Sequence, residues 1–141
     1  MRNTLVPAFV GFEDLFDRVF KDFGSRSLAD HRTSLFDTAY PRYNIIKNDD
    51  GYVIELALAG FKKEELSITE ANGILTISGE HEWAYDANSL VHHGISSKSF
   101  TRTFDLNSNL EVGDVNFVDG ILSVRLTKIK DNEEVRKIEI K

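Results

Sequence analysis

YVIELALAG, residues 52–60, is the stretch that decides the fold of this chain of 141 residues. Its apolar side chains recur at every second position, so Ile54, Leu56 and Leu58 lie on one face of an extended strand. Such alternation is typical of a half-buried β-strand, and no strong helical pattern competes with it after Pro41. The stretch therefore predicts a sheet.

The same period of two continues along the chain as far as Leu126. Further in-phase apolar residues are Leu66, Ile68, Leu75, Ile77, Phe100, Phe104, Leu106, Val115, Phe117, Leu122, Val124 and Leu126. Between these segments stand Asp50-Gly51, Asn72-Gly73 and Asp119-Gly120, dipeptides that suit type I′ hairpin turns. Short strands separated by such turns predict an all-β fold, an antiparallel sandwich or barrel.

Before Pro41 the pattern is different, because aromatic residues recur at helical spacing. We predict an amphipathic helix that ends at Gly24. An aromatic helical face is most often core, but a sandwich has its own apolar residues and does not need this one. A surplus helix would bury against another subunit or stay exposed and bind other proteins. Its apolar face comprises Phe9, Phe12, Leu15, Phe16, Val19, Phe20 and Phe23.

Residues 79–99 are too many for an ordinary hairpin connection. Long loops in compact domains are usually functional or disordered. This one contains Trp83, Tyr85, Leu90 and Val91, so simple disorder is a poor explanation. Residues 89–94, SLVHHG, could form a short strand that pairs with a sheet edge of another subunit.

Arg102 lies in phase with Phe100 and Phe104, on the face that should be buried. A buried guanidinium needs a partner. One interpretation is an edge strand from which Arg102 extends to solvent. We favour an ion pair at a subunit contact, for which the long loop offers three acidic residues: Glu80, Glu82 and Asp86.

Near its end the chain carries Ile138-Glu139-Ile140, behind a charged stretch over residues 128–137. In an extended tail both isoleucines point the same way. Two exposed isoleucines reduce solubility and join no local core. The tail is therefore expected to dock in a slot on another molecule, which favours an assembling protein over a self-contained enzyme.

Composition and motifs argue against several other functions. A net charge of −6 with no basic run makes nucleic acid an improbable partner. Cysteine is absent, as are a signal peptide and a membrane span, which fits a cytoplasmic protein. We expect no metal site, cofactor or catalytic residue. His31, His81, His92 and His93 lack ligand spacing, Glu64-Glu65 and Glu133-Glu134 look solvated, and Gly-x-Ser-x-Gly, Walker A and Rossmann patterns are missing.

Several passages together resemble the small heat shock proteins, the α-crystallin family. PRYNIIKNDDGYVIELALAGFKKEELSIT, from Pro41, is similar to the opening of the α-crystallin domain. GISSKSFTRTFDL, from Gly94, resembles the strand that carries the family's arginine, here Arg102. VNFVDGILSVRL is similar to the A-x-x-x-N-G-x-L signature, with Asp119 in place of its Asn. Residues 138–140 match the C-terminal I-x-I motif, and the pattern is closest to the bacterial inclusion-body-binding branch. Asn107 stands where many members have proline.

This resemblance implies a seven- or eight-stranded immunoglobulin-like sandwich over residues 41–128. An N-terminal arm, 1–40, would precede it and a C-terminal extension, 129–141, would follow. Ile138 and Ile140 would fill a groove walled by Leu66, Ile68, Val115 and Phe117. The long loop would carry a strand that pairs with a partner, with a dimer interface at Arg102, Glu82, Asp86, Leu90 and Val91. Unfolded client proteins would bind the arm at Phe9, Phe12, Phe16, Phe20 and Phe23.

The function that the resemblance implies is an ATP-independent chaperone, a holdase that binds unfolding proteins and prevents their aggregation. It would work as a dynamic oligomer of dimers in the cytoplasm. One alternative is a co-chaperone-like β-sandwich adaptor that binds a folded partner, although such an adaptor would lack the long loop and the I-x-I tail. A small hydrolase using paired carboxylates is a further rival, but no desolvated acidic pair is visible.

Overall fold

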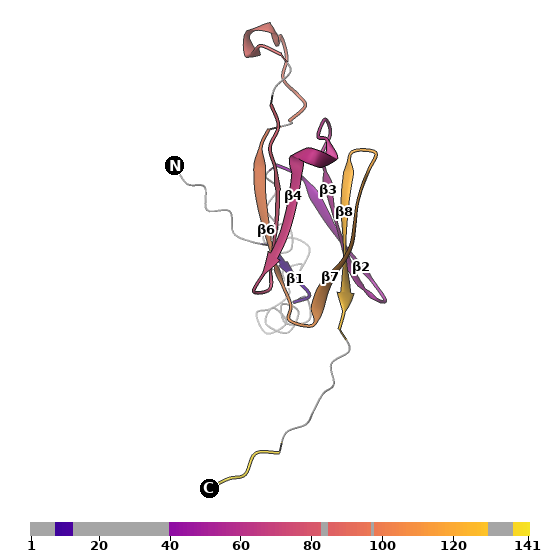
Figure 1. The fold of residues 1–141 in the computed structure, drawn as a ribbon, viewed down its shortest axis with the longest axis vertical. Coiled ribbons are helices and arrows are strands. Elements are labelled where there is room, and N and C mark those ends of the chain that lie inside the picture. Colours follow the sequence, from indigo (N-terminus) through magenta and orange to yellow (C-terminus); the bar gives the residue numbers. More distant parts are fainter. Residues whose placement is uncertain (1–7, 13–39, 83–84, 97, 130–136) are drawn as a thin grey trace, which may run out of the picture.

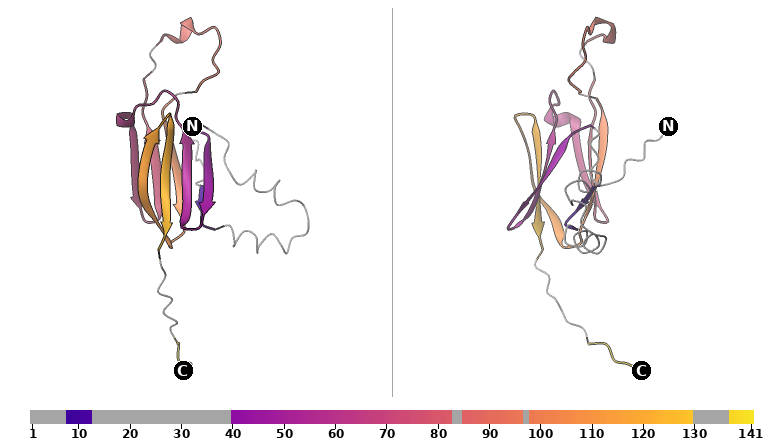
Figure 2. Two further views of the ribbon diagram at one scale, coloured as in Figure 1. Left: turned by 90° about the vertical axis from the view of Figure 1, so that its right-hand side faces the viewer. Right: turned by 180° about the vertical axis from the view of Figure 1, so that it is seen from behind.

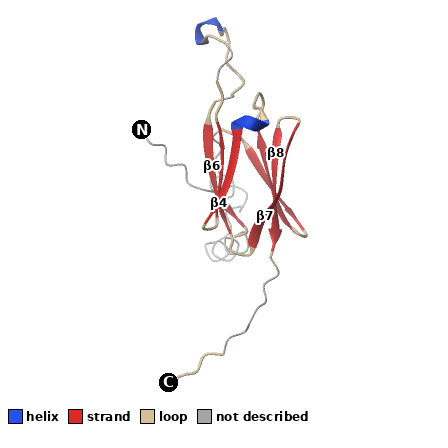
Figure 3. Ribbon diagram, in the orientation of Figure 1, coloured by secondary structure: helices blue, strands red, loops and turns tan. Residues whose placement is uncertain are grey.

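Alternating apolar residues form strands on both sides of the stretch that begins at Tyr52. The computed structural model describes residues 8–12, 40–82, 85–96, 98–129 and 137–141. Strands dominate this part of the chain, with two short 3₁₀ turns, η1 (Lys63–Glu65) and η2 (Ala87–Ser89) (Figure 3). The strands are β1 (Ala8–Val10), β2 (Tyr43–Asn48), β3 (Gly51–Ala57), β4 (Leu66–Ala71), β5 (Ile74–Gly79), β6 (Phe100–Leu106), β7 (Leu110–Val118) and β8 (Ile121–Lys128).

Two four-stranded sheets face each other as a sandwich (Figure 1). One has the order β1-β6-β5-β4 and the other the order β2-β3-β8-β7. Every pairing is antiparallel except that of β1 with β6, which is parallel. The left view of Figure 2 shows β4 and β7, one edge strand from each sheet, on the same side of the sandwich. The predicted all-β sandwich is confirmed.

The core lies between the sheets and is built from the alternating positions. Side chains at every second residue of β3, β5, β6 and β8 are buried, which is the consequence of the period-2 pattern. The largest fully buried residues come from both sheets and from the segments beside them: Phe104, Ile54, Leu56, Leu58, Leu75, Ile77, Leu122, Leu126, Val10, Val124 and Pro41.

Two of the three predicted glycine turns form as expected. Asn72 and Gly73 have φ values of 53° and 76°, and the Asp119-Gly120 turn repeats this geometry. Positive φ at both central residues is what a type I′ turn requires.

The third predicted turn, Asp50-Gly51, is wrong by one residue. Asn48 pairs with Gly51 in the ladder, so the two loop residues are Asp49 and Asp50. Gly51 already belongs to β3, with φ 152°. A Cβ at this position would collide with the backbone oxygen of Leu126 on the neighbouring strand. Close approach of two strands, rather than turn geometry, therefore explains this glycine.

The predicted N-terminal helix does not begin at Phe9. Ala8–Val10 instead forms β1, whose Ala8 and Val10 are buried while Phe9 faces outward. The interpretation that the sandwich needs nothing from this segment is also wrong, because Val10 is fully buried in the core. The remainder of the predicted helix, with Phe16, Phe20 and Phe23, lies outside the described residues.

The long connection between β5 and β6 extends beyond the end of the sandwich (Figure 1). Its described residues contain η2 but no strand, so the short strand proposed for residues 89–94 does not form in the single chain. A β-strand needs a neighbouring strand for its backbone hydrogen bonds. The loop extends away from the sheets of its own chain, so residues 89–94 have no such neighbour there. Pairing with another subunit stays a prediction.

Candidate interaction surfaces

The edge strands β4 and β7 carry the residues predicted to wall the tail-binding groove. Leu66, Ile68 and Phe117 are half-buried and pack against the core, while Val115 is 39% exposed. β4 pairs only with β5, and β7 only with β8, within the described part of the chain. Each strand thus offers backbone groups and partly exposed apolar side chains along an open edge. That these four residues receive the tail remains a prediction.

The tail shows why a partner is needed. Residues 137–141 stand away from the sandwich (Figure 1), with Ile138 76% and Ile140 100% exposed. Covering these two aliphatic side chains with another surface would lower the free energy of the system, because apolar surface would leave water. The tail is therefore a free apolar ligand in this conformation, separated from its own core.

Arg102 is buried at the centre of β6, as its phase predicts. Only 3% of its surface is exposed, so the alternative in which the side chain extends to solvent is wrong. Its Nη2 donates to the backbone oxygen of Pro41 over 3.5 Å, and its guanidinium carbon lies 5.3 Å from the ring centroid of Tyr43. These contacts show how a buried cation is accommodated within one chain.

The loop residues assigned to the dimer interface lie at varied depths. Glu82 and Asp86 are exposed, Leu90 is half-buried, and Val91 is fully exposed. Asp86 receives hydrogen bonds from Asn88 and Ser89 and so shapes the turn η2. A predicted ion pair of the Asp86 carboxylate between subunits would share that group with the hydrogen bond from the Asn88 N–H, since both Ser89 bonds go to the Asp86 backbone oxygen. The interface itself remains a prediction.

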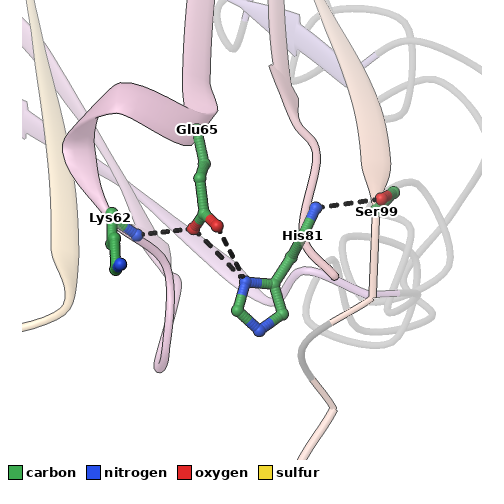
Figure 4. A network of polar contacts seen from close by, with 4 residues as sticks. All are labelled: Lys62, Glu65, His81 and Ser99. Atoms are coloured by element: carbon green, nitrogen blue, oxygen red, sulfur yellow. Dashed lines mark hydrogen bonds and ion pairs between the residues drawn. The ribbon is translucent and has the colours of Figure 1, made fainter. Parts of the chain in front are cut away.

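A polar cluster joins the base of the long loop to the turn before β4 (Figure 4). Glu65 accepts a hydrogen bond from the backbone N–H of Lys62 at 2.7 Å, and its two carboxylate oxygens lie 3.2 and 3.3 Å from His81 Nδ1. The backbone N–H of His81 donates to Ser99 Oγ at 3.1 Å. Because His81 and Ser99 lie at the two ends of the loop, the cluster fastens both ends to the sandwich.

Glu65 differs from the solvated carboxylate that we expected from the sequence. The backbone N–H of Lys62 lowers the pKa of Glu65, and the hydrogen bond and charge of His81 lower it further against partial burial. His81 is likewise half-buried, with its ring 5.2 Å from that of Phe61. Spacing in the sequence could not reveal this pair, because the contact arises from the fold.

Phe9 of β1 faces outward from the sandwich, and Phe12 lies next to it. Phe9 is 43% exposed and meets Phe12 edge to face, with ring centroids 5.9 Å apart. Both belong to the predicted client-binding set, whose other members lie outside the described residues. The exposed ring of Phe9 and the half-buried ring of Phe12 are suited to apolar contact.

Asn107 is a residue that sequence reasoning undervalued. Its backbone N–H donates to the Val10 oxygen at 2.9 Å, and its Nδ2 donates to the Gly11 oxygen at 2.9 Å. A proline, expected here by resemblance, could make neither bond. The departure from the family pattern was visible, but its meaning depends on where β1 lies.

Two searches of the described residues complete this survey. They contain no group of three or more His, Cys, Asp or Glu side chains that could hold a metal ion. Among the same residues, none of the helices is long and apolar enough to cross a membrane.

Comparison with known proteins gives a consistent result. Residues 44–141 match the Hsp20/alpha crystallin family. The small heat shock protein IbpA of Salmonella typhimurium is similar to this chain, with 32% identity over 146 residues that cover 99% of each protein. IbpA of Citrobacter koseri shows the same identity and coverage.

Solved structures agree with the sequence relatives. A small heat shock protein from Synechococcus phage S-ShM2 has 33% identity and a TM-score of 0.56, covering 72% of this chain and 100% of its own. C-terminally truncated AgsA from Salmonella typhimurium has 30% identity and a TM-score of 0.58, with the same coverage. A small heat-shock protein from Xylella fastidiosa, at 21% identity and TM-score 0.61, supports the fold alone; it covers 74% of this chain and 99% of its own.

Proposed function

Since this chain belongs to the Hsp20/alpha crystallin family of small heat shock chaperones, we propose that it is an ATP-independent holdase. It binds unfolding proteins through exposed apolar surface and prevents their aggregation. The observation that carries the proposal is the exposed I-x-I tail, taken together with the open edges of β4 and β7. Apolar groups kept in water on a stable sandwich are available to other chains.

The tail links subunits of a dynamic oligomer built from dimers. Burying each isoleucine contributes roughly 1.5–3 kcal/mol, and ordering the tail offsets much of this gain. A single docking event is therefore weak, on the order of millimolar. Many tails in one particle act at high effective concentration, so the particle persists while individual links open. Leu66, Ile68, Val115 and Phe117 receive the tail in this proposal.

Clients bind the Phe-rich arm and the grooves that tails vacate. Phe9 and Phe12 support this assignment, because their rings pack edge to face and Phe9 is exposed. Warming opens tail links and shifts the population toward smaller, more exposed species. Light scattering at rising temperature tests this step, and a constant particle size and exchange rate would contradict it.

The same proposal assigns no catalytic residue and no cofactor to the chain, and it places the protein in the cytoplasm. Its partners are unfolded proteins and further copies of itself. Residues 1–40 serve as the client-binding arm, in which β1 also completes one sheet; residues 41–128 form the rest of the sandwich, and 129–141 form the linking extension.

An aggregation assay without nucleotide tests the function directly. A heat-labile enzyme is warmed with and without the full-length chain, and light scattering follows its aggregation. We expect the chain to suppress the signal, and a variant with Phe16, Phe20 and Phe23 changed to serine to suppress it less. An adaptor for a folded partner would leave the aggregation of the warmed enzyme unchanged, as would a hydrolase.

A further inference from the structure

β1 joins the sheet from far away in the sequence. It lies parallel to β6, with Ala8 beside Phe104 and Val10 beside Leu106. Ala8 and Val10 are 8% and 0% exposed, while Phe9 between them faces outward beside Asp105. Two side chains of β1, Ala8 and Val10, thus complete a core that residues 40–129 otherwise build.

The ladder that holds β1 is short. β6 runs from Phe100 to Leu106, but β1 pairs only with its last three residues. In the described part of the chain, the rest of that edge has no strand beside it. A three-residue parallel pairing makes few hydrogen bonds, and parallel pairs are slightly less stable per residue than antiparallel ones. The strand is therefore the most weakly attached element of its sheet.

Asn107, the residue after β6, acts as a latch on β1. Its backbone N–H bonds the Val10 oxygen and its Nδ2 bonds the Gly11 oxygen, each at 2.9 Å. Its Oδ1 meanwhile accepts from the N–H of Asn109 at 3.3 Å, and its backbone oxygen accepts from the N–H of Leu110 at 3.0 Å. One side chain therefore connects the end of β1 to the turn between β6 and β7.

Gly11 makes this close approach possible. It has φ +89°, a conformation that favours glycine, and a Cβ there would lie 2.8 Å from Asn107 Cβ and 3.0 Å from Leu110 Cδ1. The side-chain bond of the latch thus joins two residues, Gly11 and Asn107, that lie outside both strands. It can be weakened without altering any strand of the sandwich.

We propose that β1 is a releasable strand, and that the slot it leaves on β6 receives an extended segment of an unfolded polypeptide. This proposal rests on the holdase function and assigns that function a specific site. Release would expose the backbone groups of β6 from Phe104 to Leu106, together with the apolar sides of those two residues. An unpaired edge of this kind binds an added strand through main-chain hydrogen bonds.

The side chains of β1 indicate which residues an unfolded segment would need in order to bind in the same slot. The inward positions hold an alanine and a valine, so the slot takes a small residue followed, two positions later, by a β-branched aliphatic residue. The position between them lies beside the Asp105 carboxylate, which favours a neutral or basic residue and disfavours an acidic one. Such segments are common in the buried strands of proteins and are exposed when those proteins unfold.

A disulfide across the β1–β6 pair tests release. The chain has no cysteine, so Phe9→Cys with Asp105→Cys introduces the only thiols, at positions that are neighbours in the ladder. The oxidised and reduced states of one protein then differ only in the cross-link. Thr69→Cys with Thr76→Cys, neighbours on β4 and β5, is the matched control for a pair that stays together.

We expect oxidation to weaken binding of reduced, carboxymethylated α-lactalbumin by about tenfold in the β1–β6 variant, since the competent state is no longer populated. The control should bind equally in both states. Equal binding by the oxidised and reduced β1–β6 variant would overturn the proposal.

A photoreactive amino acid at Thr103 then identifies the occupant of the edge. With α-lactalbumin as the probe, Asn107→Ala should raise the yield of its adduct several-fold over wild type, while Ser108→Ala in the same turn should not. A photoreactive residue at Glu55 on β3, a central strand of the other sheet, serves as the positional control. Adducts that form with a second copy of this chain, or equally at both positions, would contradict the proposal.

These tests separate the slot from the function it serves. If the wild-type chain fails to suppress aggregation without nucleotide, the holdase function is wrong. If it suppresses aggregation equally well with β1 cross-linked, the holdase function stands and the slot is wrong.

Discussion

Arg102 and Tyr43 connect the two sheets of the sandwich, with the guanidinium carbon 5.3 Å from the centroid of the tyrosine ring. Arg102 belongs to β6 and Tyr43 to β2, so this cation–π contact crosses the interior from one layer to the other. The same Tyr43 ring meets Phe104 edge to face at 5.3 Å. A charge is thus held inside an otherwise apolar region by an aromatic face and a backbone oxygen.

Reversal of this charge should be strongly destabilising. In Arg102→Glu a carboxylate faces the Pro41 oxygen and the negative face of the Tyr43 ring, and we expect the free energy of unfolding to fall by about 3–5 kcal/mol. Denaturant unfolding followed by circular dichroism measures the change. Arg125→Glu, on the exposed face of β8, is the control and should shift stability by no more than about 0.5 kcal/mol. Similar losses in both variants would argue against a special role for Arg102.

Gly51 should tolerate no side chain. Gly51→Ala places a Cβ against the Leu126 oxygen at a φ of 152°, so backbone strain alone should cost about 1–3 kcal/mol, and displacement of β8 adds to it. Gly113→Ala, where a Cβ meets its nearest neighbours at 3.5 Å, is the matched control and should leave the melting temperature nearly unchanged. If Gly51→Ala had the same melting temperature as wild type, the explanation by close approach of two strands would be refuted.

The Glu65 cluster should make the loop base sensitive to acid. Folding lowers the pKa of Glu65 below its ordinary value of 4.5, so its contribution is fully present above that value. It is lost as the pH falls through the lowered, folded-state pKa. Glu65→Gln should therefore be less stable than wild type near about pH 7, and the difference should shrink in acid.

Urea unfolding of both proteins across the acid range checks this expectation. Glu64→Gln is the control, because Glu64 is an exposed neighbour on the same turn. A difference between Glu65→Gln and wild type that persists unchanged in strong acid would exclude the ionised carboxylate as its source.

The tail should control assembly without affecting the fold. Ile138→Ala with Ile140→Ala removes side chains that are exposed in the single chain, so the melting temperature should stay as in wild type while large particles give way to dimers. Gel filtration with light scattering measures the mass. Glu139→Ala, between the two isoleucines, should keep the large particle. A double variant that still elutes as a large particle would show that other surfaces hold the oligomer.

Much of the sandwich could be predicted because its determinants are local. Alternation at Ile54, Leu56 and Leu58 depends only on neighbouring residues, and the Asn72-Gly73 turn needs only its two φ angles. The burial of Arg102 followed from its phase on β6 for the same reason. Features that depend only on a few neighbouring residues can be predicted without knowledge of the fold.

What could not be predicted depends on contacts across the chain. β1 is three residues long and is stabilised by its pairing with β6, which the local sequence does not reveal. The helical spacing of the aromatic residues therefore led to the prediction of a helix in this segment. Glu65 and His81 meet because β4 and β5 pair, which their sequence spacing does not reveal. The family resemblance marked Asn107 as unusual, but its partners at Val10 and Gly11 could be identified only once β1 was in place.

The bond from Asn107 to Gly11 spans 96 positions and therefore has a consequence for synthesis on the ribosome. At roughly 5–20 residues per second, residues 8–12 precede their partners by about 5–20 s. During that interval β1 has no β6 with which to pair. It is then accessible to other nascent chains nearby, before the sandwich has folded. The time that β1 spends outside the sheet is set by the speed of translation. In every newly made copy, β1 is therefore unpaired until β6 has been synthesised.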